Sequence, residues 1–171
     1  GTGEFHLKSH KTNEKGGLDK EKATKIIEAN RGRLNDFQEK LYAQDRWSVL
    51  LIFQGMDAAG KDSAIKSVFE GVNPQGCEVT SFKQPSTKEL DHDFLWRAAR
   101  ALPERGRIGI FNRSYYEEVV TVRIHPEFLE KQRLPPRCTG KKLWDDRLED
   151  IAGFERYLAR NGIVILKFFL N

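Results

Sequence analysis

Residues 55–63 read Gly-Met-Asp-Ala-Ala-Gly-Lys-Asp-Ser and follow directly on the apolar run of residues 47–54. Gly55 and Gly60 allow the backbone to curl so that successive N–H groups point at an anion, and Lys61 adds a positive charge. The next residues carry apolar side chains at helical spacing, so the loop opens a predicted helix whose N-terminus also attracts anions. This order of elements indicates a phosphate-binding loop. The alternative interpretation is a glycine-rich turn that closes a βα unit.

The loop departs from the usual pattern at two positions. Ser or Thr commonly follows the lysine and ligates Mg²⁺, whereas here Asp62 follows it and Ser63 comes one residue later. Asp57 lies inside the loop, where a carboxylate repels phosphates unless a cation lies between them, so we expect Asp57 to hold a phosphate-bound metal ion. Lys61 is expected to be solvent-accessible and to pack little. The candidate phosphate-binding positions of the loop are Gly55, Ala58, Ala59, Gly60, Asp62 and Ser63.

Chain length and composition limit the class of protein. A chain of 171 residues supports one domain with a good core and is too short for two ordinary ones. Cys77 and Cys138 are far apart and lack metal-ligand spacing, which fits free thiols in the cytoplasm. No apolar stretch approaches a membrane span, and no Cys/His cluster or nucleophilic triad supports metal-site hydrolysis or acyl transfer. The net charge of +4 suits a polyanionic partner.

Both ends of the sequence suggest a piece of a longer protein. Residues 1–17 are polar and aperiodic, and we expect a flexible N-terminal tail there. The other end stops in Ile-Val-Ile-Leu-Lys-Phe-Phe-Leu-Asn, the pattern of a buried strand with no covering element after it. We therefore expect a fragment that is incomplete at both termini, with one truncated domain over residues 18–171.

Apolar periodicity predicts a chain of alternating helices and strands. Such alternation favours an α/β fold, in which helices cover both faces of a parallel sheet and ligands bind at the carboxyl ends of the strands. The predicted helices span about 18–44, 61–71, 91–102, 114–124 and 141–160, and the predicted strands about 47–53, 77–82, 107–111 and 163–170.

A second candidate motif follows the predicted strand at 107–111. Phosphate-loop enzymes often end such a strand in an acidic residue that positions Mg²⁺, but Asn112 takes this position and offers only a neutral oxygen. Glu117 and Glu118 lie about one helical turn further on and can supply the missing charge. Arg113 is placed for a transferring phosphoryl group. The alternative is an ordinary strand-to-helix turn with an Asn-Arg-Ser cap.

Further basic residues have two interpretations. A charge run is usually a solvated face, but beside a phosphate loop it can extend the binding track of a long polyanion. Nucleic acid fits less well, because no aromatic residues are interleaved with the charges. On the loop after residue 81, Lys83 is expected to face the site, and Phe82 either lines it or packs in the core. The basic run comprises Arg123, Arg133, Arg137, Lys141 and Lys142.

These segments together resemble family-2 polyphosphate kinases. The resemblance rests on the loop at 55–63, Ser-Phe-Lys-Gln-Pro-Ser at 81–86, Ile-Gly-Ile-Phe-Asn-Arg-Ser-Tyr-Tyr-Glu-Glu-Val at 108–119 and Ile-Leu-Lys-Phe-Phe-Leu at 165–170, and it extends from about residue 18 to the end. It implies a three-layer, thymidylate-kinase-like P-loop fold without the C-terminal lid. It also implies phosphoryl transfer between inorganic polyphosphate and a nucleotide, with Mg²⁺.

The resemblance also implies roles for particular residues. Asp57, Lys61, Arg113 and Glu117 would be catalytic, and Asp57, Asn112 and Glu117 would hold the metal. Asn112 in place of Asp resembles the subgroup that accepts both AMP and ADP, and the family suggests a dimer or tetramer. Phosphate contacts outside the loop would come from Lys83, Asn112 and Arg123, and the basic run adds Arg133 and Arg137 as candidate phosphate-binding residues.

Two other functions remain open on the sequence. An ATP-dependent nucleoside monophosphate kinase shares the fold and the loop, and a non-catalytic P-loop binding module would need only the loop. We expect a cytoplasmic enzyme that acts on polyphosphate and adenine nucleotides, without a nucleic-acid or membrane partner.

Overall fold

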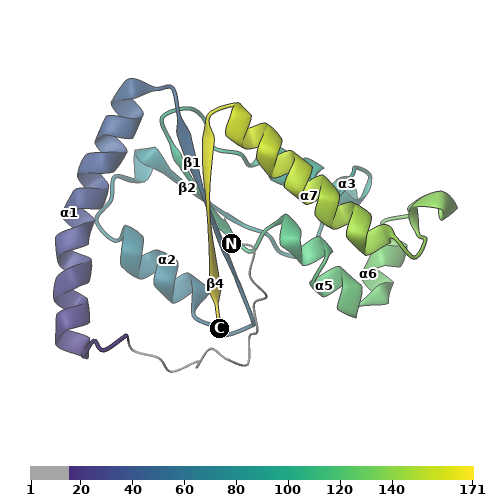
Figure 1. The fold of residues 1–171 in the computed structure, drawn as a ribbon, viewed down its shortest axis with the longest axis horizontal. Helices are drawn as coiled ribbons and strands as arrows, with labels where there is room; N and C mark the ends of the chain where they lie inside the picture. Colours follow the sequence, from purple (N-terminus) through teal and green to yellow (C-terminus); the bar gives the residue numbers. More distant parts are fainter. Residues whose placement is uncertain (1–15) are drawn as a thin grey trace.

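A four-stranded, entirely parallel sheet forms the centre of the fold (Figure 1). The computed structural model describes residues 16–171, so the predicted tail lies outside the described residues except for Gly16 and Gly17. The strand order is β2-β3-β1-β4, which confirms the predicted α/β fold with a parallel sheet. The strands are β1 (Ser48–Gly55), β2 (Cys77–Ser81), β3 (Ile108–Asn112) and β4 (Ile163–Leu170).

Helices cover both faces of the sheet. Strand β1 is central and apolar along its length, because a central parallel strand is buried on both sides. Its Leu50 and Ile52 belong to the core beneath α7 (Leu143–Arg160). Its alternate residues belong to a second core that includes Leu41 of α1 (Lys20–Gln44) and Ile65 of α2 (Lys61–Phe69). In Figure 1, α1 and α2 accordingly lie on one side of the sheet and α7 on the other.

Helix α1 is only partly buried along its apolar face. Its start is capped by the Asp19 carboxylate, which accepts a 2.8 Å hydrogen bond from the backbone N–H of Lys22. Leu41 is buried, whereas Ile26 and Phe37 are about half exposed. The helix therefore contacts the rest of the fold mainly through its C-terminal half.

Two predicted helices are broken into shorter elements. Instead of one helix over 91–102, the chain forms α3 (Thr87–Leu90) and α4 (Trp96–Arg100). A capping box between Ser86 and Glu89 starts the first helix early. The Asp93 carboxylate then accepts a 2.9 Å hydrogen bond from the N–H of Leu95, forming a local turn that competes with continuous helix.

The predicted helix over 114–124 is likewise replaced by the 3₁₀ helix η3 (Tyr115–Glu118) and by α5 (Thr121–Ile124). The β-branched pair Val119-Val120 separates them, and β-branched side chains lower helix propensity. The remaining elements are η2 (Pro74–Gly76), α6 (Pro126–Lys131) and η4 (Pro136–Cys138). Among residues 16–171, no helix is both long enough and apolar enough to span a membrane.

Candidate active site

The glycine-containing loop follows β1 and lies beside the end of β3. The two strand ends are joined where the N–H of Arg113 donates a 3.0 Å hydrogen bond to the carbonyl of Phe53. Gly60, with φ of +86°, immediately precedes α2, so the loop opens a helix as predicted. Gly55 lies so close to β4 that a Cβ there would be 2.4 Å from the carbonyl oxygen of Leu170. The backbone therefore requires glycine at both ends of the loop.

Lys61 is buried, contrary to the expectation of a solvent-accessible lysine. Only 7% of its surface is exposed. Its ammonium donates hydrogen bonds of 3.0 Å to the carbonyl of Gly55 and 2.8 Å to that of Met56. Carbonyl oxygens on the inside of a tight loop need donors, and the lysine supplies them. The positive charge is thus held at the loop, within reach of an anion bound by it.

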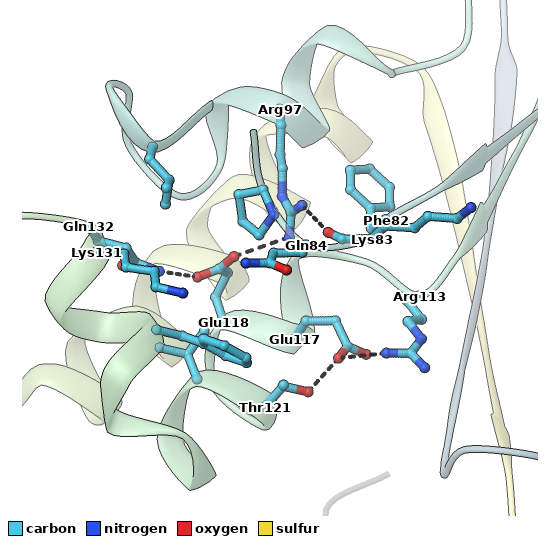
Figure 2. Close-up of a pocket in the computed structure, with 14 residues that line it drawn as sticks. Phe82, Lys83, Gln84, Arg97, Arg113, Glu117, Glu118, Thr121, Lys131 and Gln132 are labelled. Carbon is cyan, nitrogen blue, oxygen red and sulfur yellow. Dashed lines mark hydrogen bonds and ion pairs between the residues drawn. The ribbon is translucent and has the colours of Figure 1, made fainter. Parts of the chain in front are cut away.

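Arg113 lies between two carboxylates from different elements. Its guanidinium forms an ion pair with Asp57 of the loop. It also lies 3.7 Å from the carboxylate of Glu117 on η3, and Figure 2 shows these two side chains facing each other. Arg113 itself adopts φ of +64°, an unusual value for a residue with a side chain. The fold thus brings together three of the four predicted catalytic residues, with Lys61 in the same loop as Asp57.

The carboxylate of Glu117 is held by neutral donors as well. Its side chain is 13% exposed. It accepts a 2.8 Å hydrogen bond from the amide of Gln54 and a 2.5 Å bond from the hydroxyl of Thr121. The amide of Asn112, at the end of β3, donates a 2.5 Å hydrogen bond to Asp62. Two side chains of the second motif are therefore hydrogen-bonded to the first: Glu117 to Gln54 of β1, and Asn112 to Asp62 of the loop at 55–63.

A pocket extends from this group of charges toward α5 and α6. In Figure 2, Lys83 and Arg113 lie on one side of the pocket, and Lys131 and Gln132 lie on the opposite side. Phe82 is buried in the core as well as lining the pocket, so both of its predicted roles hold. The apolar lining residues are Phe82, Pro85, Leu90, Val122 and Phe128, and the charged ones are Lys83, Arg97, Arg113, Glu117, Glu118 and Lys131.

Glu118 does not join Glu117 at the loop. Its side chain is 3% exposed, and its carboxylate lies 3.2 Å from the guanidinium of Arg97 and 3.6 Å from that of Arg147. It also accepts a 2.7 Å hydrogen bond from the amide of Gln132. Burial lowers the pKa of Arg147 despite the neighbouring charge of Glu118.

The sequence pattern does not predict this cluster of Arg97, Gln132 and Arg147 around Glu118. The available signal was the acidic pair at 117–118, because adjacent residues of a helix point in different directions. A carboxylate turned into the core requires basic partners from elsewhere in the chain.

The five residues of the predicted basic run lie in α5, just after α6, in η4 and just before α7. Arg123 lies on α5, and Arg133 forms an ion pair with Asp91. Arg137 lies in η4, and Lys141 and Lys142 precede α7. All five side chains are exposed, and Lys131 of the same segment lines the pocket. Both interpretations, a solvated face and a polyanion track, remain compatible with these positions.

Comparison with known proteins identifies clear relatives. Residues 17–171 match the family described as Polyphosphate kinase 2. The ADP-polyphosphate phosphotransferase of Rhodopseudomonas palustris is 54% identical over 153 residues, which make up 89% of this chain and 53% of that protein. The AMP/ADP-polyphosphate phosphotransferase of Meiothermus ruber is 40% identical over 171 residues, or 99% of this chain and 60% of that protein.

A solved structure shows the same fold. The crystal structure of polyphosphate kinase 2 from Arthrobacter aurescens TC1 matches with a TM-score of 0.86 at 33% sequence identity. The match covers 100% of this chain and 58% of that one. The chain thus spans a little more than half the length of these three relatives.

Proposed function

This chain belongs to the polyphosphate kinase 2 family, and on that premise we propose that it transfers phosphoryl groups between inorganic polyphosphate and adenine nucleotides. Both AMP and ADP serve as acceptors in this proposal. The observation that carries it is the meeting of the loop at 55–63 with Arg113 and Glu117 at the carboxyl ends of β1 and β3. Phosphoryl transfer needs positioning and charge neutralisation more than covalent chemistry from the protein, and this arrangement can provide both.

Positive charge is present where two polyanions would have to approach each other. Lys61 is held in the loop by its carbonyls, and Arg113 is held by Asp57 and Glu117. Lys83 lines the adjoining pocket from a third loop. We assign Lys61 and Arg113 to the transferring phosphoryl group and Lys83 to neighbouring phosphates. Loop amides from Gly55 to Ser63 would hold the remaining phosphate oxygens.

The residues around Arg113 fit a Mg²⁺ ion that is shared with substrate. Among the described residues, no group of three or more Asp, Glu, His or Cys side chains could hold a metal alone. Two carboxylates, Asp57 and Glu117, nevertheless contact the same guanidinium. Mg²⁺ is commonly bound through one or two carboxylates together with substrate phosphates. Asp57 and Glu117 would hold the ion with Asn112 as a neutral oxygen ligand, and bound Mg²⁺ would neutralise phosphate charge during transfer.

The pocket offers a place for the nucleoside part of the acceptor. Its wall combines Phe82, Leu90 and Phe128 with the charges of Lys83 and Arg113. Apolar and aromatic walls with a few charged groups at one end are suited to a base and its attached phosphates. The names of the two relatives include AMP/ADP and ADP as nucleotides, which supports adenine nucleotides as the acceptor class.

The proposal includes one phosphotransferase domain over residues 18–171, a cytoplasmic location and a homodimer or homotetramer. Both cysteines are free, which is compatible with a reducing compartment. In an oligomer, a partner subunit would cover part of the apolar surface of α1 and β4, where Phe37 and Phe169 expose more than half of their surface. Light scattering of the purified protein would measure its oligomeric state.

One assay tests the function. The protein is incubated with AMP or ADP, Mg²⁺ and either long-chain polyphosphate or ATP. We expect ADP and ATP to form with polyphosphate as donor. Transfer only from ATP would identify a nucleoside monophosphate kinase, and tight binding of polyphosphate without turnover would identify a binding module.

A further inference from the structure

Arg97 of α4 connects two loops that meet at the pocket. One end of its guanidinium donates a 2.8 Å hydrogen bond to the main-chain carbonyl of Lys83. The other end lies 3.2 Å from the carboxylate of Glu118. The first contact is on the loop after β2 and the second is on η3, which follows β3. Figure 2 shows Arg97 reaching both loops from the helix that borders the pocket.

The loop that carries Lys83 has few other anchors. Its start is fixed where the N–H of Phe82 bonds to the carbonyl of Asn112 at 3.0 Å. Its end is fixed by the capping box at Ser86. Between them, within residues 16–171, the Arg97 contact is the only hydrogen bond to the main chain of residues 83–85. Within the described residues, Arg97 is thus the only hydrogen-bonding anchor of the short segment that carries Lys83.

Glu118 does not need Arg97 to remain paired. Arg147 donates a 2.9 Å hydrogen bond to the backbone carbonyl of Glu118, and its guanidinium also lies 3.6 Å from the carboxylate. Gln132 donates a further hydrogen bond to the same carboxylate. A buried carboxylate that keeps a cation and a neutral donor avoids the large cost of an unpaired buried charge. The fold should therefore survive removal of the Arg97 guanidinium.

We propose that Arg97 is a positioning residue, which holds the loop at 83–85 against η3 and thereby fixes the place of Lys83 at the edge of the pocket, on the same side as Arg113. This inference rests on the proposed function, in which Lys83 contacts substrate phosphates. Arg97 lines the pocket, but its side chain is only 9% exposed and packs over the ring of Phe82. Both ends of its guanidinium are already engaged by the Lys83 carbonyl and by Glu118, so we assign its effect to the loop and not to contact with phosphates. Displacement of a substrate-contacting group by about 1 Å can reduce turnover by on the order of 100-fold.

A double-mutant cycle tests this coupling. We expect Arg97→Met to lower kcat/KM for the phosphoryl donor by about 10- to 100-fold. If Arg97 acts through Lys83, the double variant with Lys83→Met should be no worse than Lys83→Met alone by more than about threefold. Arg97→Lys keeps the charge but cannot span both loops, so it should restore only part of the activity. Multiplicative losses in the double variant would overturn the proposal.

Arg100→Met is the matched control. Arg100 lies one turn further along α4, and its guanidinium is 4.8 Å from the centre of the Trp96 ring, so the variant removes the same charge without touching the Lys83 carbonyl. Its kcat/KM should stay within about twofold of wild type. If Arg100→Met lowered kcat/KM as much as Arg97→Met does, the loss would reflect removal of a positive charge in general, and the proposal for Arg97 would be wrong.

A second measurement does not depend on activity. Trypsin cleaves after Lys83 only when the loop opens, and we expect that cleavage to be about tenfold faster in Arg97→Met than in wild type or Arg100→Met. Equal cleavage rates would overturn the proposal whatever the enzyme assay shows. The cycle is run with the donor that the wild-type protein uses, so failure of polyphosphate as donor would refute the proposed function and leave the Arg97 test intact.

Discussion

The ammonium of Lys61 lies 2.8 Å from the carbonyl oxygen of Met56, so the loop lysine is bound to its own loop before any phosphate arrives. A second bond, to the carbonyl of Gly55, completes the arrangement. Such a lysine is preorganised, because little reorientation is needed when an anion enters. It also stabilises the loop, which a freely exposed lysine would not do.

Lys61→Ala should therefore have two effects of different size. Loss of a charge aimed at the transferring group should cost on the order of 3 kcal/mol of transition-state stabilisation, or more than 100-fold in kcat. Loss of two hydrogen bonds should cost about 1–3 kcal/mol of unfolding free energy and leave the protein folded. Turnover and denaturant unfolding on one preparation measure both. Lys66→Ala, at an exposed position of α2, is the control, and turnover of Lys61→Ala within a few-fold of wild type would remove Lys61 from the mechanism.

Asn112→Asp should change acceptor preference. The present amide donates to Asp62, and an aspartate would place two carboxylates together and alter the proposed metal site. We expect the ratio of kcat/KM for AMP and ADP to change more than the better of the two rates falls, because the site is altered and not removed. Adding Asp62→Asn restores a donor–acceptor pair with the polarity reversed and should recover part of the wild-type ratio. An unchanged ratio in Asn112→Asp would show that Asn112 does not set acceptor choice.

Affinity for long polyphosphate should fall steeply with ionic strength if the basic run forms a track. Release of counterions from an extended polyanion gives this dependence, and neutralising Arg133 and Arg137 together should make it shallower. The control is the joint neutralisation of Arg33 and Lys40, two exposed residues of α1. It removes the same charge from a helix that lies on the opposite side of the molecule from α6 in Figure 1. Equal effects of the two pairs, or a flat salt response, would favour a solvated face. Titrations at several salt concentrations measure this.

Stability should decline in alkali because of a cluster that joins η3, α7 and β4. Burial raises the pKa of Tyr115 and of Tyr116 above the ordinary value of 10.0, and the negative charge of Glu155 adds to the effect on both. Burial alone would lower the pKa of Lys167, but its hydrogen bonds to Glu155 and Tyr116 raise it above 10.5. Groups with raised folded pKa values stabilise the fold fully below their unfolded pKa values and lose that contribution as the pH rises.

Unfolding free energy should therefore be insensitive to these groups up to about pH 9 and should decrease above about pH 10. Tyr116→Phe removes one of the titrating hydroxyls and should make the decrease shallower. Tyr42→Phe changes an exposed tyrosine of α1 and should leave the slope unchanged. Urea unfolding at a series of pH values gives the slopes, and equal slopes in wild type and Tyr116→Phe would contradict the assignment.

The sheet and the loop could be predicted because their signals are local. A continuous apolar strand, two glycines and a lysine at fixed spacing indicate one backbone path regardless of the rest of the chain. The two broken helices could not be predicted from apolar periodicity. The cap at Ser86 and the turn at Asp93 are hydrogen-bonded alternatives to the longer helix. Apolar periodicity reports only the spacing of apolar residues, so it does not detect these side-chain to backbone hydrogen bonds.

The charged groups divide in the same way. That Asp57, Arg113 and Glu117 meet follows from parallel strands ending at one edge of a sheet, which the sequence pattern predicts. Which of the adjacent residues Glu117 and Glu118 faces the loop depends on the conformation of η3. The pairing of Glu118 with Arg97 and Arg147 joins residues distant in sequence, and no local pattern specifies it.

The sequence by itself therefore determined the fold class, the loop and the set of residues gathered at the strand ends, because short-range spacing controls backbone path and strand polarity. Only the tertiary structure decided that Lys61 is buried against its own loop, that Glu118 is removed into a core cluster and that Arg97 joins two loops. Burial and long-range pairing arise from the packing of distant segments. Side-chain direction in a short 3₁₀ turn is set by those neighbours, since a few residues have too little local preference to fix it.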